Sequence, residues 1–469
     1  MTHDDILKKV TGAIDVLIKA GGKYEGLFPS MLDLKTHEML MEIPAVIPGQ
    51  RRGDRSPLGS NLIHDETTLR TMYALNRPDY KAAADRYLKR FATHCTDTVT
   101  GLFPWGEHAY WDLIEDGIGN SSRQHNPDST NPAIHDQLRQ VPTWLWEKLY
   151  EFNPKCVVRF AEGLDYHWKE GEPVEYTRHG EIEVKAYAER HELASFDFAR
   201  HGGLYVFDWA YAYFKTGRED FLAQIRKMMD YWWTARYEDG LLPTCRRCTE
   251  KVVPFYQVRA SGQTIGLAVG LLDSAKLLDE KQPELAAQMR EQAAVYLNGF
   301  LDSPHDLEKG IFITSFKPGD DSLTTAMPVW GSVYGIWPAS YTALTCLCCY
   351  RHTGDERLLK WSEAVANFYL KEPMPDGAAI PSMDSGLALG LLADLYDITG
   401  EARWLDGGMK LAEKLIAVYL DGDLPRGAAG IDWYESQMGP GFLLHSLTRI
   451  ALLSRDGKNC PLEADYTAR

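Results

Sequence analysis

One short phrase recurs along this chain and limits the folds that it can adopt. It reads YFKTGREDFL from position 213, YRHTGDERLL from position 350 and YDITGEARWL from position 396. Each copy combines an aromatic residue with a Thr-Gly pair typical of a helix end, and the acidic residues that follow favour a new helix start. The glycines lie at positions 217, 354 and 400, so the first gap is close to three times the second. A spacing of about 46 residues is the length of one helical hairpin with its loops.

Repeated helical hairpins must pack against one another, because a single hairpin cannot bury its own apolar face. Segments 79–94, 218–237, 284–301, 356–370 and 401–420 carry apolar residues every three or four positions, as amphipathic helices do. Six or seven hairpins closing into a ring would bury all of these faces. We therefore expect an all-α fold, an (α/α)6 or (α/α)7 toroid, with residues 1–469 as one domain.

Long segments without helical periodicity interrupt this pattern. Ordered loops of such length in a compact domain are usually functional, and we expect them to form a cleft at one end of the ring. Strand-like alternation is strongest within one of them, and it predicts a small β-hairpin insertion at 170–192 that turns at His179-Gly180. The segments are 26–62, 100–142, 170–203, 240–262, 303–338 and 376–384.

Composition narrows the location and the class of partner. A formal net charge of −16 argues against a nucleic-acid binder, which needs a basic face. No stretch approaches the roughly 18–20 apolar residues of a membrane span. The first residues lack the pattern of a secretion signal, and the eight cysteines show no disulfide framework. We expect a cytoplasmic protein without nucleic-acid or membrane partners, and a homo-oligomer is compatible with the sequence.

Two of four local clusters in the loops precede residue 120. In the first, Arg51, Arg52 and Arg55 lie within five residues, and His64 follows. Three such arginines could clamp a carboxylate in bidentate fashion, although a solvated basic loop explains the pattern equally well. The second cluster reads LFPWGEHAYWD from position 102. Its histidine suits metal ligation or a hydrogen bond to a sugar hydroxyl, but a buried structural histidine is the commoner outcome.

The other two clusters join histidine to a second charged residue. His135-Asp136 precedes a helix expected at 141–152, where an acid is often only a cap. Arg200-His201 is followed by two glycines, which permit close backbone approach. Two more Arg-His pairs, at 178–179 and 190–191, lie nearby. A loop crowded with cations in an acidic protein favours an anionic ligand.

The motifs WGEH at 105–108, HDQL at 135–138 and FARHG at 198–202 together resemble family 2 polysaccharide lyases, the pectate lyases built on an α/α barrel. The resemblance covers about residues 100–203. It implies a divalent metal held by His108, Asp136 and His201, with Arg200 as the base, and no organic cofactor. Mn, Mg and Ca are conceivable, and imidazole ligands favour Mn.

Two departures from that pattern concern the ligands and the cleft. The acid is Asp136 where the family has glutamate, and the segment from there to Arg200 contains an insertion with His191-Glu192, a competing metal pair. An altered cleft end indicates a different or shorter substrate than polygalacturonate.

A uronic acid loses its C5 proton readily only when its carboxylate is neutralised and the enolate stabilised. Arginine stays protonated, so we expect Arg200 to bind the carboxylate of an acidic oligosaccharide while Tyr110, Tyr176 or His179 takes the proton. His108 and His201 complete the expected catalytic set. Further substrate contacts are expected from Arg51, Arg52, Arg55, His64, Trp105, Glu107, Trp111, Arg178 and His191.

Two alternatives to the lyase stay open. The chain is also similar to α/α-toroid glycosidases that release glucuronic or unsaturated uronic acid with two carboxyl groups. The candidates for that pair are Glu107, Asp112, Asp136, Glu192 and Asp197. A non-catalytic sugar-binding toroid ranks last, because the polar residues converge on a few loops.

Overall fold

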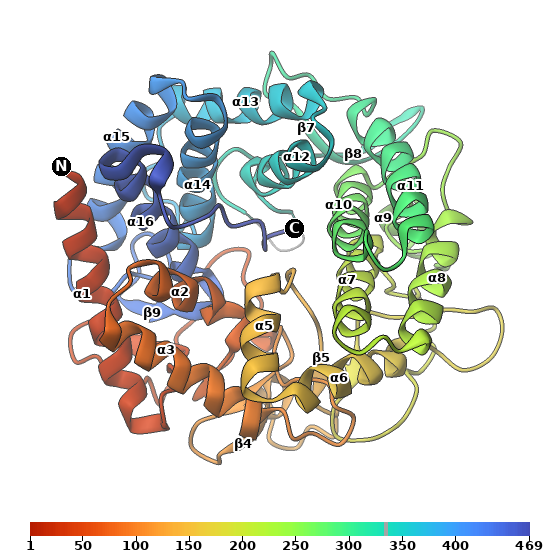
Figure 1. The fold of residues 1–469 in the computed structure, drawn as a ribbon, viewed down its shortest axis with the longest axis horizontal. Helices are drawn as coiled ribbons and strands as arrows, with labels where there is room; N and C mark the ends of the chain where they lie inside the picture. Colours follow the sequence, from red (N-terminus) through yellow and green to blue (C-terminus); the bar gives the residue numbers. More distant parts are fainter. Residues whose placement is uncertain (333–335) are drawn as a thin grey trace.

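The computed structural model describes residues 1–332 and 336–469, and it arranges most of their helices in an inner and an outer ring (Figure 1). Around the inner ring lie α2 (Leu62–Ala74), α5 (Thr143–Phe152), α7 (Ala199–Thr216), α10 (Ser261–Leu278), α12 (Ala339–Thr353), α14 (Ser382–Thr399) and α16 (Pro440–Asp456). Their outer partners, in the order that pairs each with an inner helix, are α3 (Pro78–Arg90), α6 (Pro154–Gly163), α8 (Glu219–Trp233), α11 (Pro283–Leu301), α13 (Glu356–Lys371), α15 (Ala402–Tyr419) and α1 (His3–Gly21). Within the described residues the fold is therefore an (α/α)7 toroid, and the sequence prediction is confirmed.

The recurring phrase ends three inner helices, α7, α12 and α14. Its glycines Gly217, Gly354 and Gly400 have φ angles of 68°, 69° and 72°, a left-handed conformation that other residues adopt only with strain. Each glycine N–H donates to the carbonyl oxygen of the tyrosine four residues earlier. The chain thus turns sharply from an inner helix to its outer partner.

Inner and outer helices differ in how much of their surface is buried. The inner helix α14 is buried almost all round, whereas the outer helix α15 buries one stripe that includes Trp404, Leu411 and Leu415. Helix α5 joins its inner neighbours through two indoles. Trp144 Nε1 donates to Glu66 of α2 at 3.1 Å, and Trp146 Nε1 donates to Asp208 of α7 at 3.0 Å.

Small antiparallel sheets and two short helices, α4 (Ser121–His125) and α9 (Val253–Tyr256), fill the loops. β1 (Met31–Asp33) pairs with β9 (Trp433–Glu435), and β5 (Ile134–His135) pairs with β6 (Gly180–Glu181). The three-stranded sheet contains β2 (Gly59–Ser60), β3 (Ala109–Asp112) and β4 (Gly117–Asn120), and the remaining sheet is the hairpin of β7 (Phe312–Lys317) and β8 (Asp320–Met327).

The hairpin expected at 170–192 requires correction. Its backbone pairs with several neighbours instead of with itself: Thr177 N donates to His167 O, Arg178 N donates to Phe196 O, and β6 pairs with β5. The segment is an irregular loop across one end of the ring, which carries Arg178 and His179 inward.

Residues near 469 enter the middle of the ring, where Figure 1 places this end of the chain. Arg469 forms an ion pair with Asp273 of α10, and its backbone oxygen accepts a hydrogen bond of 2.9 Å from Arg200. Among the described helices, none has the length and apolar character to cross a membrane.

Candidate active site

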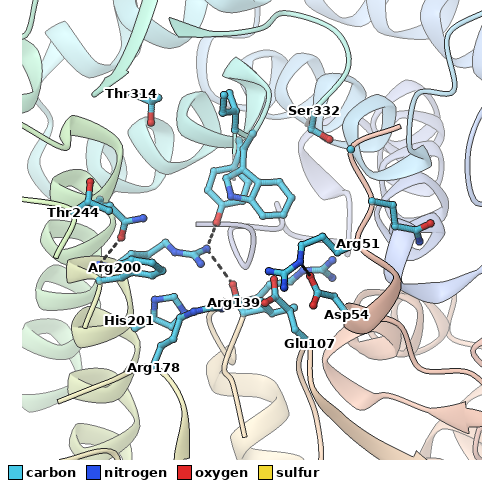
Figure 2. Close-up of a pocket in the computed structure, with 18 of the residues that line it drawn as sticks. Arg51, Asp54, Glu107, Arg139, Arg178, Arg200, His201, Thr244, Thr314 and Ser332 are labelled. Atoms are coloured by element: carbon cyan, nitrogen blue, oxygen red, sulfur yellow. Dashed lines mark hydrogen bonds and ion pairs between the residues drawn. The ribbon is translucent and has the colours of Figure 1, made fainter. Parts of the chain in front are cut away.

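A cavity of about 880 Å³ opens at the end of the ring where the inner helices begin (Figure 2). Residues in the first turns of α2, α7, α10, α12 and α14 line it. The N-terminal ends of helices carry partial positive charge, so this end of the toroid favours an anionic ligand. The charged and imidazole side chains of the lining are Arg51, Asp54, His64, Glu107, His108, Arg139, Arg178, His179, His191, Arg200, His201 and Asp384.

Gly106 positions two of these residues. Its φ angle is +102°, and a methyl group on its α-carbon would lie 1.9 Å from the carbonyl oxygen of Asp136. Asn61 Nδ2 donates to the Gly106 carbonyl oxygen at 2.9 Å. This close backbone approach brings Glu107 and His108 beside Asp136.

Asp136 is buried behind the cavity among cationic and imidazole groups. Arg178 Nη1 forms an ion pair with it and contacts Glu107 Oε2 at 3.1 Å. The Nε2 atoms of His201 and His179 lie 3.4 and 3.9 Å from the Asp136 carboxylate. Burial opposes the ionisation of Asp136, but Arg178 and His201 outweigh it and hold its pKa well below the usual range.

The imidazoles around this carboxylate are neutral at neutral pH. Burial lowers the pKa of His201 to about 3, and it lowers the pKa of His179 well below its usual value. Burial also lowers the pKa of His108. Neutral imidazoles can bind a metal or accept a proton.

These residues fit a divalent metal ion in donor type and spacing. Donor atoms of His108, Asp136 and His179 lie within 4.8 Å of one another. Within the described structure, Nε2 of His179 is buried without a hydrogen-bond partner. A bound metal ion would give such a buried nitrogen atom a partner. The family resemblance implies His108, Asp136 and His201 as ligands. In the structure His179 takes the third position beside His108 and Asp136, and His201 lies next to Asp136.

Asp54 is a site residue that sequence reasoning did not single out. It lies in a 3₁₀ turn, Arg52–Asp54, and its oxygens are 3.6 Å from Arg51 Nε and 3.8 Å from His108 Nδ1. Carboxyl oxygens of Asp54 and Glu107 lie within 4.8 Å of each other. Burial and the charge of Glu107 raise the pKa of Asp54 to about 7. The turn stands inside the arginine-rich cluster, which was the only signal for it.

Arg139 and Arg200 are two buried cations that face the same cavity. They are 6% and 9% exposed, and neither forms an ion pair with the side chain of a described aspartate or glutamate. Arg200 Nη1 donates to the carbonyl oxygen of Leu138 at 3.1 Å, to the Tyr341 hydroxyl and to the backbone oxygen of Arg469 at 2.9 Å, whereas its Nε is buried without a hydrogen-bond partner among the described residues. Burial lowers the pKa of Arg139 to about 10. A buried guanidinium without an acidic side chain as its partner is costly, and an anionic ligand would compensate for that cost.

Arg139 was missed although it directly follows the His135–Leu138 motif. The other arginines that were expected to bind substrate fall into two groups. Arg51 and Arg178 line the cavity as expected, whereas Arg52 is exposed and donates to His125. The prediction that Arg55 contacts substrate was wrong, because Arg55 is fully buried in a bidentate ion pair with Glu435 at 2.6 and 2.7 Å. That pair satisfies its charge inside the fold.

The predictions for the aromatic residues of the second cluster, LFPWGEHAYWD, were also wrong. Trp105 is fully buried among the rings of Phe103 and Phe160. Tyr110 fills the space between two glycine backbones of the three-stranded sheet, and Trp111 Nε1 donates to Asp116 at 3.0 Å. These three side chains lie outside the cavity lining and stabilise the loop that presents Glu107 and His108.

The remaining expected residues lie at different depths. His64 is buried and lines the cavity from α2, and His191 is an exposed residue of its rim. Tyr176, a candidate base, lies outside the lining and donates to the Phe198 carbonyl oxygen at 2.9 Å. Like Asp136, three other candidate carboxylates lie outside the lining. Asp112 caps a turn, Glu192 is exposed, and Asp197 accepts hydrogen bonds from Ser195 and Tyr231.

No protein-family model matches the chain, and no curated protein matches its sequence. Solved structures of similar shape include a sugar epimerase from a ruminal bacterium, with 12% identity, 80% of this chain and 88% of that chain covered, and a TM-score of 0.48. An unsaturated glucuronyl hydrolase specific for heparin has 11% identity, 97% and 99% coverage and a TM-score of 0.48. Cellobiose 2-epimerase from Bacillus thermoamylovorans has 8% identity, 96% and 98% coverage and a TM-score of 0.47. These likenesses concern shape and not ligand.

Proposed function

We propose that this protein is an enzyme that cleaves uronic-acid-containing oligosaccharides by β-elimination. The observation that supports the proposal is the pair of buried arginines, Arg139 and Arg200, which form no ion pair with an aspartate or glutamate side chain among the described residues. They share one cavity with Glu107, His179 and His201. A cationic binding position beside neutral imidazoles suits abstraction of a proton next to a carboxylate.

In this proposal Arg200 and Arg139 bind the uronate carboxylate, which makes the C5 proton more acidic. His201 is the base, because its Nε2 faces Asp136 at 3.4 Å and its Nδ1 has no hydrogen-bond partner among the described residues. The C5–H bond breaks, the proton passes to His201 Nδ1, and its electron pair forms the C4–C5 double bond. The C4–O bond breaks, and in this proposal Asp54, whose pKa is raised to about 7, protonates the leaving oxygen.

A divalent metal is a second source of positive charge at this position. The residues that would hold it are His108, Asp136 and His179, and the ion would stabilise the enolate as a Lewis acid. Arg178 forms an ion pair with Asp136, one of these residues, and keeps its carboxylate ionised.

Cleavage of a panel of uronate oligosaccharides tests the reaction. Elimination creates an unsaturated uronate, so ultraviolet absorbance must rise as reducing ends appear. Release of reducing ends at constant absorbance would contradict elimination and support hydrolysis.

Hydrolysis is the second candidate, and one observation favours it. Asp54 and Glu107 bring two carboxyl groups together in the cavity, as glycosidases require, and Arg178 holds Glu107. Loss of all hydrolysis in both Asp54→Asn and Glu107→Gln would support this reaction.

A further inference from the structure

The lining of the cavity is divided into a cationic and an uncharged side. Every described arginine and histidine of the lining lies between residues 51 and 201, and the described lining residues from 244 to 438 include no cation. In Figure 2, Arg139 and Arg178 lie on the lower side, whereas Thr314 and Ser332 lie on the upper side. The division in the sequence is therefore also a division in space.

The uncharged side has the groups that bind a neutral sugar ring. The rings of Trp337 and Tyr341 are stacked with their centroids 5.4 Å apart, and both line the cavity. Aromatic rings pack against the apolar faces of sugar rings. Thr314, Ser315 and Thr325 of the β7–β8 hairpin add hydroxyl groups, which can donate to or accept from sugar hydroxyls.

Among the described residues of this side, Asp384 is the one carboxylate. It lies in the first turn of α14 and is 1% exposed. Ser332 donates to it twice, from its backbone N–H at 2.6 Å and from its hydroxyl at 3.1 Å. Among the described residues its partner is Ser332, and no cation forms an ion pair with it. The carboxylate can accept further hydrogen bonds from sugar hydroxyls, but it would repel a second sugar carboxylate.

We propose that the position next to the uronate takes an uncharged sugar, so that the substrate is a mixed saccharide and not a polyuronate. The proposal rests on the proposed function and names its substrate class. Tyr341 connects the two sides, because its ring stacks on Trp337 and its hydroxyl accepts a hydrogen bond from Arg200. The uncharged ring would therefore lie beside the carboxylate held by Arg200.

Two oligosaccharides with the same uronate test this inference, one linked to a neutral sugar and one to a second uronate. The wild type should show a kcat/KM at least about tenfold higher for the mixed saccharide. Asp384→Asn keeps the shape and the Ser332 contacts, and it should bring the two values close together by raising turnover of the diuronate. Asp406→Asn, on the exposed surface of α15, removes the same charge elsewhere and should leave the ratio unchanged.

Trp337→Ala provides a second reading that does not depend on Asp384. It should raise KM for the mixed saccharide several-fold with little change in kcat. A wild type that prefers the diuronate, or an unchanged ratio in Asp384→Asn, would overturn the inference while the proposed function stands. If the wild type turned over neither saccharide and no other uronate, the result would contradict the proposed function and the inference with it.

Discussion

The backbone of Gly106 lies directly against the carbonyl oxygen of Asp136, with room for a hydrogen atom and not for a methyl group. A β-carbon there would lie 1.9 Å from that oxygen, and the φ angle of +102° is itself strained for other residues. This contact fixes the loop that presents Glu107 and His108.

Gly106→Ala should therefore move the loop away from Asp136. We expect a stability loss of about 1–3 kcal/mol and, in the protein that remains folded, a fall in kcat/KM of at least about tenfold. Thermal unfolding and kinetics measure the two effects. Gly53→Ala is the matched control, because its added methyl group meets no atom within 4 Å. A folded Gly106→Ala variant with full activity would show that the loop position is unimportant.

Replacement of either buried arginine should weaken substrate binding. Arg200→Ala and Arg139→Ala each remove a guanidinium from a buried charge-assisted contact, so kcat/KM for a uronate saccharide should fall by about 10- to 100-fold. Arg52→Ala, at an exposed arginine outside the lining, should have little effect. Unchanged kinetics in both cavity variants would place the carboxylate elsewhere.

Metal binding can be measured directly by titrating chelator-treated protein with Mn²⁺ in a calorimeter. We expect one bound ion, a binding loss of at least about tenfold in His179→Ala, and restoration of activity by the ion. His191→Ala, at the exposed rim, should bind the ion normally. Chelator-treated protein that binds no Mn²⁺ and is fully active would remove the metal from the account.

A buried acid outside the cavity predicts how stability changes with pH. Burial raises the pKa of Asp65 to about 7, although Tyr87 and Ser60 donate hydrogen bonds to it. The folded state then holds more protons than the unfolded state between about pH 4 and 7, so the free energy of unfolding falls as pH rises through this range. The effect of this one group is a few kcal/mol at most.

Urea denaturation at pH 5 and pH 8 checks this prediction. Asp65→Asn should lose less stability between the two pH values than the wild type, because its side chain does not titrate. Asp406→Asn, at an exposed acid, should behave like the wild type. An identical loss in Asp65→Asn and the wild type would contradict the assignment.

The fold was predictable where local chemistry determines it. The glycines of the Tyr-x-x-Thr-Gly phrase end helices as expected, and the repeat length indicated the ring of hairpins. The segment 170–192 was not predictable in detail, because its alternating residues contact three different neighbours and no second strand of its own.

The site was predictable only in part. Seven side chains from the WGEH and Arg-His motifs line the cavity: Glu107, His108, Arg178, His179, His191, Arg200 and His201. Trp105 and Tyr110 have the same sequence context but point into the core, and sequence does not show the side of a loop that a residue faces. Asp384 reaches the cavity through ring closure, which brings α14 beside residues far away in the sequence, whereas Arg139 lies directly after the HDQL motif and belongs to no motif of its own. The metal, the cytoplasmic location and the oligomeric state stay predictions.

Recognition of a sugar carboxylate is the central claim. Its most direct test compares a uronate saccharide with the same saccharide after reduction of the carboxylate to an alcohol. We predict turnover of the uronate and at least about 100-fold lower kcat/KM for the reduced form, because Arg139 and Arg200 lose their ionic partner. Equal turnover of the two would contradict the account.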